Sequence, residues 1–215
     1  MLESSGLYYP NRIARHFFTA MEDVMGRNGL NALLSLADLE KYSDHPPANT
    51  MERGFDFAAM AALNHALEEM YGARGGRAIA LRIGRAWVAQ GLKGFGAMKG
   101  IADPAFRALP LDQRVQLGMV ALATTFTQFS DQHSRLEESG PTDRAYRFIV
   151  EPSPMAWGRT ADRPVCHALV GALQETLRWA SNGYEFHAYE TSCRAGSGDT
   201  DRCVFVVNKR PMGQL

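Results

Sequence analysis

Three cysteines and one glutamate in the C-terminal part of the chain are the residues whose types and spacing could do chemistry. Cys193 and Cys203 flank the run RAGSGDTDR, which is rich in glycine and aspartate. Glu190 lies shortly before Cys193, and Cys166 lies further upstream. Three thiolates and one carboxylate suit a tetrahedral Zn²⁺ ion, and a site closed by four protein ligands is of the structural kind. Soft thiolate ligands argue against magnesium or calcium.

These side chains can meet only if the chain between them turns back on itself. Residues 165–180 are predicted to form a helix, with Cys166 on its buried face near the N-terminal end. Residues 184–190 have the two-residue period of a strand, which places Glu190 at the end of an apolar face. The helix advances about 24 Å and the strand returns about 20 Å, so Cys166 and Glu190 should meet. A hairpin after the strand would bring Cys193 and Cys203 to the same place.

Two other roles for these residues remain open. The cysteines could be small buried apolar residues, with Glu190 paired to an arginine such as Arg202. One of them could instead be a redox or nucleophilic cysteine, although His167 follows Cys166 directly and so points about 100° away from it around a helix. Disulfides are not expected, because three cysteines cannot pair completely and thiols stay reduced in the cytoplasm.

Composition and charge narrow the class of protein. The 215 residues are 46% hydrophobic, which suffices for a substantial core in one domain with an N-terminal helical extension. Lys+Arg and Asp+Glu both number 23, so no net charge favours nucleic acid or an anionic membrane. The sequence has no signal peptide and no apolar stretch near the roughly 18 residues of a transmembrane segment. We therefore expect a soluble cytoplasmic protein whose partner is small or apolar.

Helices are predicted for most of the first 130 residues and mixed structure after them. Apolar periodicity predicts helices at residues 11–25, 55–71, 77–95 and 111–129. Gly84 and Gly91 lie on the third of these helices, which is apolar around most of its circumference, and they indicate close approach by another backbone or by a ligand. Strand composition marks residues 144–150, 184–190 and 202–207.

The residues around the cysteines resemble the 4-vinyl-reductase domain family, also described as hydrocarbon-binding proteins. The pattern is Cys166, then Glu190-x-x-Cys193, the Gly198-Asp199 loop and Cys203-x-Phe205. The runs GGRAIALRIGRAWVAQG and DRPVCHALVGALQETLRW are also similar, so the resemblance covers roughly residues 55–208. In the family's phenol-responsive bacterial activators, three cysteines and a glutamate in this order hold zinc, which implies the same role here. The loop between the last two cysteines is about two residues longer than is common in the family, and a hairpin should tolerate this.

The resemblance implies an α/β fold of the α+β kind, with helices packed on a small antiparallel sheet, as in NO-signalling and Golgi-transport ligand-binding folds. Residues 55–210 would form this ligand-binding domain and residues 1–54 the helical extension. It also implies a buried apolar pocket and a homodimer. The family name comes from a bacteriochlorophyll-pathway protein credited with reducing a vinyl group on a tetrapyrrole. Reductase activity has little support in the residues, since GARGGR at 72–77 follows a helix and is not a dinucleotide fingerprint.

Four large apolar side chains are candidates for lining the pocket: Trp87, Phe148, Met155 and Trp157. Core packing is the competing interpretation of each. The leading hypothesis is a non-enzymatic, zinc-stabilised protein that binds an apolar or aromatic molecule, or a tetrapyrrole, as a carrier or sensor. The alternatives are a tetrapyrrole vinyl reductase or its accessory subunit, and a structural dimerisation module.

Overall fold

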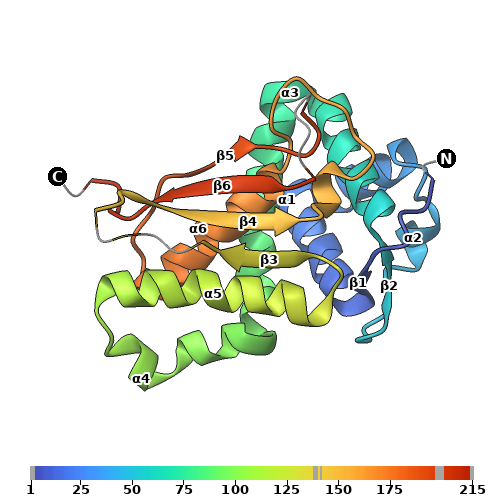
Figure 1. The fold of residues 1–215 in the computed structure, drawn as a ribbon. Helices are drawn as coiled ribbons and strands as arrows, with labels where there is room; N and C mark the ends of the chain where they lie inside the picture. Colours follow the sequence, from blue (N-terminus) through green and yellow to red (C-terminus); the bar gives the residue numbers. More distant parts are fainter. Residues whose placement is uncertain (1–2, 138–139, 141, 197–200, 214–215) are drawn as a thin grey trace.

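Helices make up most of the first 130 residues of the computed structural model, which describes residues 3–137, 140, 142–196 and 201–213 (Figure 1). The long helices are α1 (Asn11–Leu36), α3 (Phe57–Gln90) and α5 (Leu111–Phe129). The short ones are α2 (Lys41–Asp44), α4 (Pro104–Arg107) and the 3₁₀ helices η1 (Leu92–Gly94) and η2 (Gly96–Ala102). The predicted helix at residues 111–129 is confirmed as α5.

Glycines bend the two longest helices. Gly26 in α1 has φ 75° and Gly72 in α3 has φ 67°, a left-handed conformation that glycine adopts without steric cost. The predicted helices at residues 55–71 and 77–95 are therefore the two halves of α3, although α3 ends at Gln90 and not at residue 95. The chain also continues as helix beyond Gly26, where the sequence predicted a stop. Glycine bends these helices rather than ending them, because apolar residues on both sides of each bend pack into the same core.

A four-stranded antiparallel sheet forms the second layer. Its order is β3 (His133–Leu136), β4 (Ala145–Glu151), β6 (Cys203–Asn208) and β5 (Ala188–Ser192). In Figure 1, α3 and α6 (His167–Ser181) lie behind the sheet and α5 runs beside β3. A two-stranded ribbon of β1 (Tyr8–Pro10) and β2 (Arg53–Asp56) lies on the right in Figure 1, on the side of the molecule opposite the C-terminus. The expected fold class, helices on a small antiparallel sheet, is confirmed.

Three details of the predicted elements are wrong. The helix expected from residue 165 begins at His167, so Cys166 is its N-cap residue. The strand expected from residue 184 begins at Ala188, because residues 184–187 have no regular secondary structure. The strand expected at residues 144–150 is β4, and the three strands before it were not predicted, because β1, β2 and β3 are too short for alternation of polar and apolar residues to reveal them.

One hydrophobic core joins residues on both sides of the predicted boundary at residue 54. The Trp87 ring lies 5.0 Å from the Phe17 ring and 5.5 Å from the Phe126 ring, and its Nε1 donates a hydrogen bond to the Ile13 carbonyl. Tyr9 packs on Phe126 and donates to the side-chain oxygen of Gln132. The helical extension thus shares its core with the predicted ligand-binding domain, and the boundary stays a prediction.

Helices α3 and α6 cross at close range because glycine faces backbone on both. A Cβ atom on Gly84 would overlap the carbonyl oxygen of Ala168, and one on Gly171 would overlap that of Leu81. The close approach that the sequence predicted at Gly84 is therefore an approach by another helix. This contact matters for the site described next, because α6 carries Cys166 at its N-terminal end.

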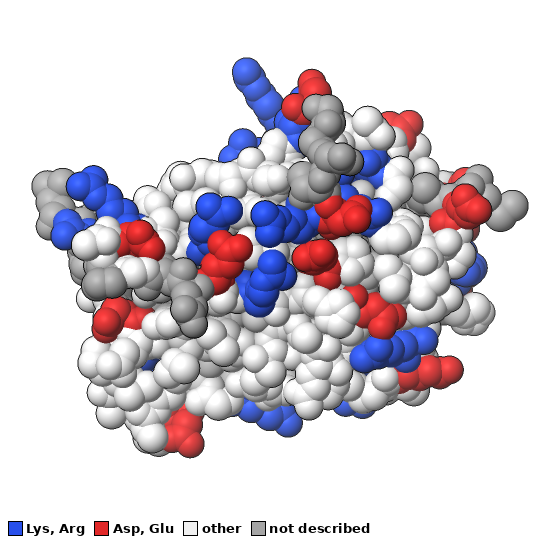
Figure 2. Space-filling view, viewed as in Figure 1, with Lys and Arg blue, Asp and Glu red and all other residues white. Residues whose placement is uncertain are grey.

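Figure 2 shows lysine, arginine, aspartate and glutamate interspersed on the face of the sheet, with no large patch of one sign on that face. Two ion pairs contribute to it, Arg135–Glu151 and Arg147–Glu137. None of the described helices is both long enough and apolar enough to cross a membrane.

Candidate metal centre

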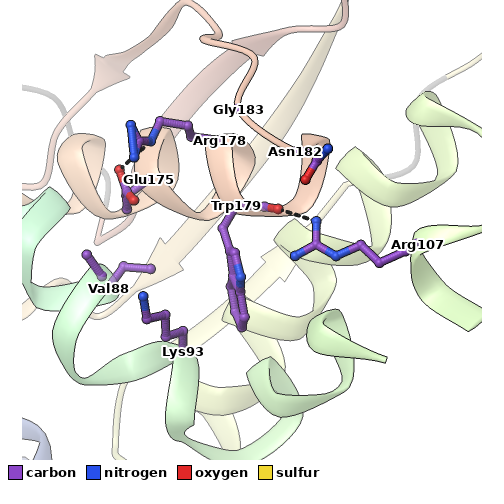
Figure 3. Close-up of a pocket in the computed structure, with 9 residues that line it drawn as sticks. Val88, Lys93, Arg107, Glu175, Arg178, Trp179, Asn182 and Gly183 are labelled. Atoms are coloured by element: carbon purple, nitrogen blue, oxygen red, sulfur yellow. Dashed lines mark hydrogen bonds and ion pairs between the residues drawn. The ribbon is translucent and has the colours of Figure 1, made fainter. Parts of the chain in front are cut away.

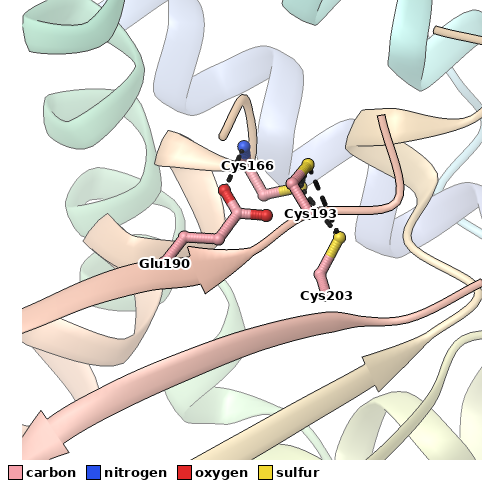
Figure 4. Close-up of side chains that lie close together, drawn as sticks. All are labelled: Cys166, Glu190, Cys193 and Cys203. Carbon is pink, nitrogen blue, oxygen red and sulfur yellow. Dashed lines mark hydrogen bonds between the residues drawn. The ribbon is translucent and has the colours of Figure 1, made fainter. Parts of the chain in front are cut away.

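The structure brings the four predicted side chains together from three places in the fold (Figure 4). Cys166 caps α6, Glu190 lies in β5, Cys193 follows β5 and Cys203 begins β6. All four are buried, and their ligand atoms lie within 4.8 Å of one another. The convergence expected from the helix and the returning chain is confirmed. The Gly198-Asp199 part of the loop lies outside the described residues.

The three sulfur atoms form a nearly regular triangle. Cys166 Sγ lies 3.5 Å from Cys203 Sγ and 3.9 Å from Cys193 Sγ, and the remaining side measures 3.8 Å. A disulfide needs sulfur atoms about 2.05 Å apart. The cysteines are therefore free thiols, arranged around a common point instead of paired.

Glu190 is the fourth member of the group, and only one of its two side-chain oxygens has a hydrogen-bond partner. Its Oε2 accepts a hydrogen bond of 2.8 Å from the backbone amide of Cys166. Its Oε1 is buried and has no hydrogen-bond partner among the described residues. Figure 4 shows this second oxygen directed towards the cysteine side. An unpartnered buried acceptor is unfavourable, and a cation between Glu190 and the thiols would satisfy it.

A bulge at the end of β5 places the next ligand. Glu190 pairs with Phe205 while Ser192 pairs with Val204, so Thr191 is an extra residue in the ladder. A bulge of this kind bends a strand and redirects the side chains that follow. The hydroxyl of Thr191 donates to the Val204 carbonyl, which fixes the bulge. Cys193 leaves the strand immediately after it.

Hydrogen bonds and burial shift the pKa values of the four side chains in different directions. Burial raises the pKa of the Cys166 thiol well above its usual value, and burial together with the neighbouring Cys193 raises that of Glu190. Hydrogen bonds from Cys166 and Cys203 lower the pKa of Cys193 to about 2. The hydrogen bond with Cys166 lowers the pKa of Cys203, but the bond with Cys193 and burial raise it on balance. Among the three cysteines, Cys193 is thus the one that carries the negative charge without a cation.

The geometry does not favour a reactive cysteine. All three cysteines are buried, including Cys193 with its lowered pKa, and a reactive thiol must be reachable. Burial and the nearby Arg77 lower the pKa of His167 to about 4, so its imidazole is neutral at pH 7 and brings no cation to a thiolate. The arrangement could hold a metal ion, and the assignment of the four residues as its ligands remains a prediction.

The four predicted ligand-lining residues lie in different surroundings. Trp87 and Met155 are fully buried in the core, and Phe148 packs on Phe205 across the sheet. Trp157 is half-buried beneath the Arg194 guanidinium, which lies 4.2 Å from the indole ring. Neither of the two cavities described below is lined by any of the four. Their role in ligand binding stays a prediction.

Two of the cavities formed by the described residues concern possible ligands. The smaller, of about 290 Å³, lies between the C-terminal ends of α3 and α6 (Figure 3). Arg107 Nη1 donates 2.7 Å to the Trp179 carbonyl there, which satisfies the end of α6. The larger, of about 700 Å³, lies between the end of α1, the first turns of α3 and residues 158–160.

Sequence reasoning missed two residues that hold the connection before Cys166. Asn64 in α3 is buried, and its amide donates to the carbonyls of Met155 and Val165. Ser153 is buried with its hydroxyl 3.2 Å from Cys166 Sγ. A lone asparagine on an apolar helix face was the available signal for the first. The serine lies in an irregular run that offers no pattern.

Comparison of the sequence with protein-family models and with curated proteins finds no match. Solved structures do match the fold. An Fe(II) unliganded H-NOX protein from K. algicida is 14% identical with a TM-score of 0.58, and the match covers 96% of this chain and 99% of that one. An H-NOX protein from S. oneidensis in the Fe(II)NO ligation state is 10% identical with a TM-score of 0.54, covering 93% and 99%.

A phenol-responsive sensory domain is a more distant match. This domain of the transcription activator PoxR, solved with phenol, is 16% identical, with a TM-score of 0.47 and coverage of 76% of this chain and 79% of that one. The H-NOX proteins match over nearly the whole of both chains. The chain has the fold of the H-NOX proteins.

Proposed function

We propose that this chain is a zinc-stabilised small-molecule-binding protein, a carrier or sensor for an apolar or aromatic ligand. Zinc would be held by Cys166, Glu190, Cys193 and Cys203. When bound, the ion would supply a fixed positive charge that closes the site, and no free position for catalysis would remain. The residues themselves join α6 to the β5–β6 hairpin.

The spacing of the sulfur atoms is the observation that carries the zinc assignment. A tetrahedral ion with Zn–S distances of about 2.3 Å places its sulfur ligands about 3.8 Å apart. The separations of 3.5, 3.8 and 3.9 Å lie around this value. The unpartnered Oε1 of Glu190 supplies the fourth donor. Three sulfurs and one oxygen suit zinc better than the hard cations magnesium and calcium.

The fold and the larger cavity support the small-molecule part of the proposal. The H-NOX proteins that share the fold are described by their Fe(II) and Fe(II)NO states. A histidine-ligated iron centre is not supported in this chain, because all six histidines are half-buried or exposed and none lies in the core. The groove of about 700 Å³ has the size of a small-molecule site.

The resemblance to the 4-vinyl-reductase family supports a tetrapyrrole as one possible ligand and a homodimer as the assembly. Both remain proposals, as does a reductase or accessory role. Sedimentation of the purified protein tests the homodimer. NAD(P)H-dependent turnover of a vinyl tetrapyrrole would support the reductase over the carrier.

Metal analysis and native mass spectrometry of the purified protein test the main proposal. We expect one zinc ion per chain, lost in Cys193→Ser with marked destabilisation, because metal binding and folding are linked. Ser192→Ala, at the neighbouring position, is the matched control and should keep its zinc. A bound organic mass supports the carrier. Unchanged thermal stability after zinc removal would contradict the structural role of the metal.

A further inference from the structure

The larger cavity is an apolar groove whose floor is made of small side chains. Ala58, Ala62 and Ala66 recur at four-residue intervals on α3, with Ala59 beside them. Because the alanine side chains are only methyl groups, they leave space above this face of α3. Leu36 at the end of α1 borders that space and is 41% exposed. Exposure of a leucine beside a concave alanine surface is unfavourable in water. An apolar occupant would remove the exposed part of Leu36 and the half-buried Ala59 from solvent.

A buried arginine at the edge of this groove lacks one partner. The Arg159 side chain is only 9% exposed. Its Nη2 donates 2.6 Å to Glu68 Oε2 and lies 3.4 Å from His65 Nδ1. Its Nη1 is buried with no hydrogen-bond partner among the described residues. An orphaned buried donor of a charged group is unfavourable. Arg159 lines the groove, so a small shift of its side chain would bring Nη1 to an acceptor carried by a ligand.

The charges of the groove favour a neutral acceptor over an anion. Arg159 is already paired with Glu68, so it brings little uncompensated positive charge. Asp38 and Asp56 also line the groove, against the single further cation Lys41 among its described lining residues. The negative charge of a carboxylate ligand would be repelled by these two aspartates. A neutral carbonyl oxygen can accept the same hydrogen bond without carrying that charge.

We propose that this groove binds a small apolar molecule that bears a neutral carbonyl oxygen, with Arg159 as the donor to that oxygen. The inference rests on the proposed small-molecule function and identifies the site and the class of ligand. The alanine floor and Leu36 contact the apolar body. Trp157, one of the four residues predicted to contact a ligand, does not line the groove. It directly precedes residues 158–160, which do.

Binding of three matched probes tests the chemistry of the site. The probes are 4-phenylbutan-2-one, butylbenzene, which lacks the oxygen, and 3-phenylpropanoate, which carries an anion. Titrations followed by NMR of ¹³C-methyl alanines should show the ketone binding about tenfold more tightly than either of the others, with shifts at Ala59 and Ala62. Equal affinity of ketone and hydrocarbon would overturn the role of Arg159.

Variants locate the site. Ala59→Phe fills the floor and should abolish binding, and Leu36→Asp, a surface change that leaves the fold intact, should weaken it at least tenfold. Leu117→Phe on the exposed face of α5 is the control of similar size and should change nothing. The double variant Arg159→Met/Glu68→Met replaces the ion pair by apolar groups and should erase the advantage of the ketone over butylbenzene.

Failure of this inference and failure of the proposed function give different results. If the ketone binds but shifts the Trp87 indole signal, and Ala59→Phe and Leu36→Asp have no effect, the groove is wrong and the small-molecule function stands. If no probe binds and the purified protein carries no organic mass, both are wrong.

Discussion

The backbone amide of Cys166 donates a hydrogen bond of 2.8 Å to Oε2 of Glu190, 24 residues further along the chain. This bond holds the N-terminal end of α6 to β5 and orients the carboxylate. The other oxygen, Oε1, is left for the three thiols. A carboxylate with one oxygen anchored by backbone is restrained before any ion binds, which favours binding.

Removing the charge of Glu190 tests this arrangement. Glu190→Gln keeps the shape but loses the anionic ligand, so zinc affinity should fall about 10- to 100-fold and the zinc-loaded protein should lose about 1.4–2.7 kcal/mol of unfolding free energy. Competition with a chromophoric chelator and thermal unfolding measure the two effects. Glu151→Gln, at the exposed end of β4, is the control and should change neither. Retention of wild-type affinity would remove Glu190 from the ligand set.

Zinc binding should release at least two protons at neutral pH. Cys166 and Cys203 have raised pKa values and hold their protons at neutral pH without metal, whereas the lowered pKa of Cys193 leaves it ionised. The raised pKa of Glu190 acts in the same direction as those of Cys166 and Cys203. All four must be deprotonated as ligands, so zinc affinity should fall steeply as pH falls. Calorimetry in two buffers with different ionisation enthalpies counts the protons. Release of one proton or fewer would contradict the predicted ligand set.

The metal-free protein should show a different pH dependence. The raised pKa of Glu190 makes stability fall as pH rises above 4.5, because the unfolded carboxyl ionises first. The lowered pKa of Cys193 makes stability rise with pH from about 2 up to 9.0. The two effects oppose each other just above pH 4.5, where the cluster should add little net slope. Urea unfolding of chelator-treated protein across this range measures it, and a steep slope that disappears in Cys193→Ser would contradict this charge distribution.

The contact between α3 and α6 supports the site from a distance. Gly84→Ala places a methyl group on the Ala168 carbonyl, so the helices must separate, and we expect a loss of about 3 kcal/mol or more. Because α6 begins beside Cys166, zinc affinity should fall as well. Gly100→Ala is the matched control, since nothing lies within 4 Å of a Cβ atom there and its φ is not positive. Urea unfolding of both variants measures the difference, and equal stabilities would contradict the close approach.

The long helices and the return of the chain to Cys166 were predictable from the sequence, and the short strands were not. The period of α5 and the return of the chain from Cys166 to Glu190 follow from local spacing, which sequence reports directly. β3 was not predicted because four residues on the sheet edge show no clear alternation. Its place is set by pairing with β4. The bulge at Thr191 likewise depends on the partner strand β6.

The groove could not be predicted for the same reason. Its walls come from the end of α1, the start of α3 and residues 158–160, which meet only in the folded chain. Ala58, Ala62 and Ala66 read as ordinary helix-face residues, and Arg159 lies in a run rich in turn residues. Nothing in local spacing indicates that Arg159 is buried beside Glu68.

Asn64 should couple the groove to the metal centre. Its amide donates to the carbonyls of Met155 and Val165 at 3.1 and 2.9 Å, which fixes the connection that carries Arg159 and ends at Cys166. Asn64→Ala leaves both carbonyls without this donor and should reduce stability by about 1–3 kcal/mol. It should weaken zinc binding and ketone binding together. Glu69→Ala, at an exposed position on the same helix, is the control.

Chelation provides the reciprocal test of this coupling. The Ala161 amide donates to the Ala195 carbonyl at 2.7 Å, so the hairpin loop that carries Cys193 also holds the groove segment. Removing zinc should therefore weaken ketone binding, and ketone should tighten zinc binding by the same factor, because coupling between two sites is reciprocal. Titrations of each ligand with and without the other measure both factors. Independent affinities would show that the connection transmits nothing, and Asn64→Ala should then lose stability alone.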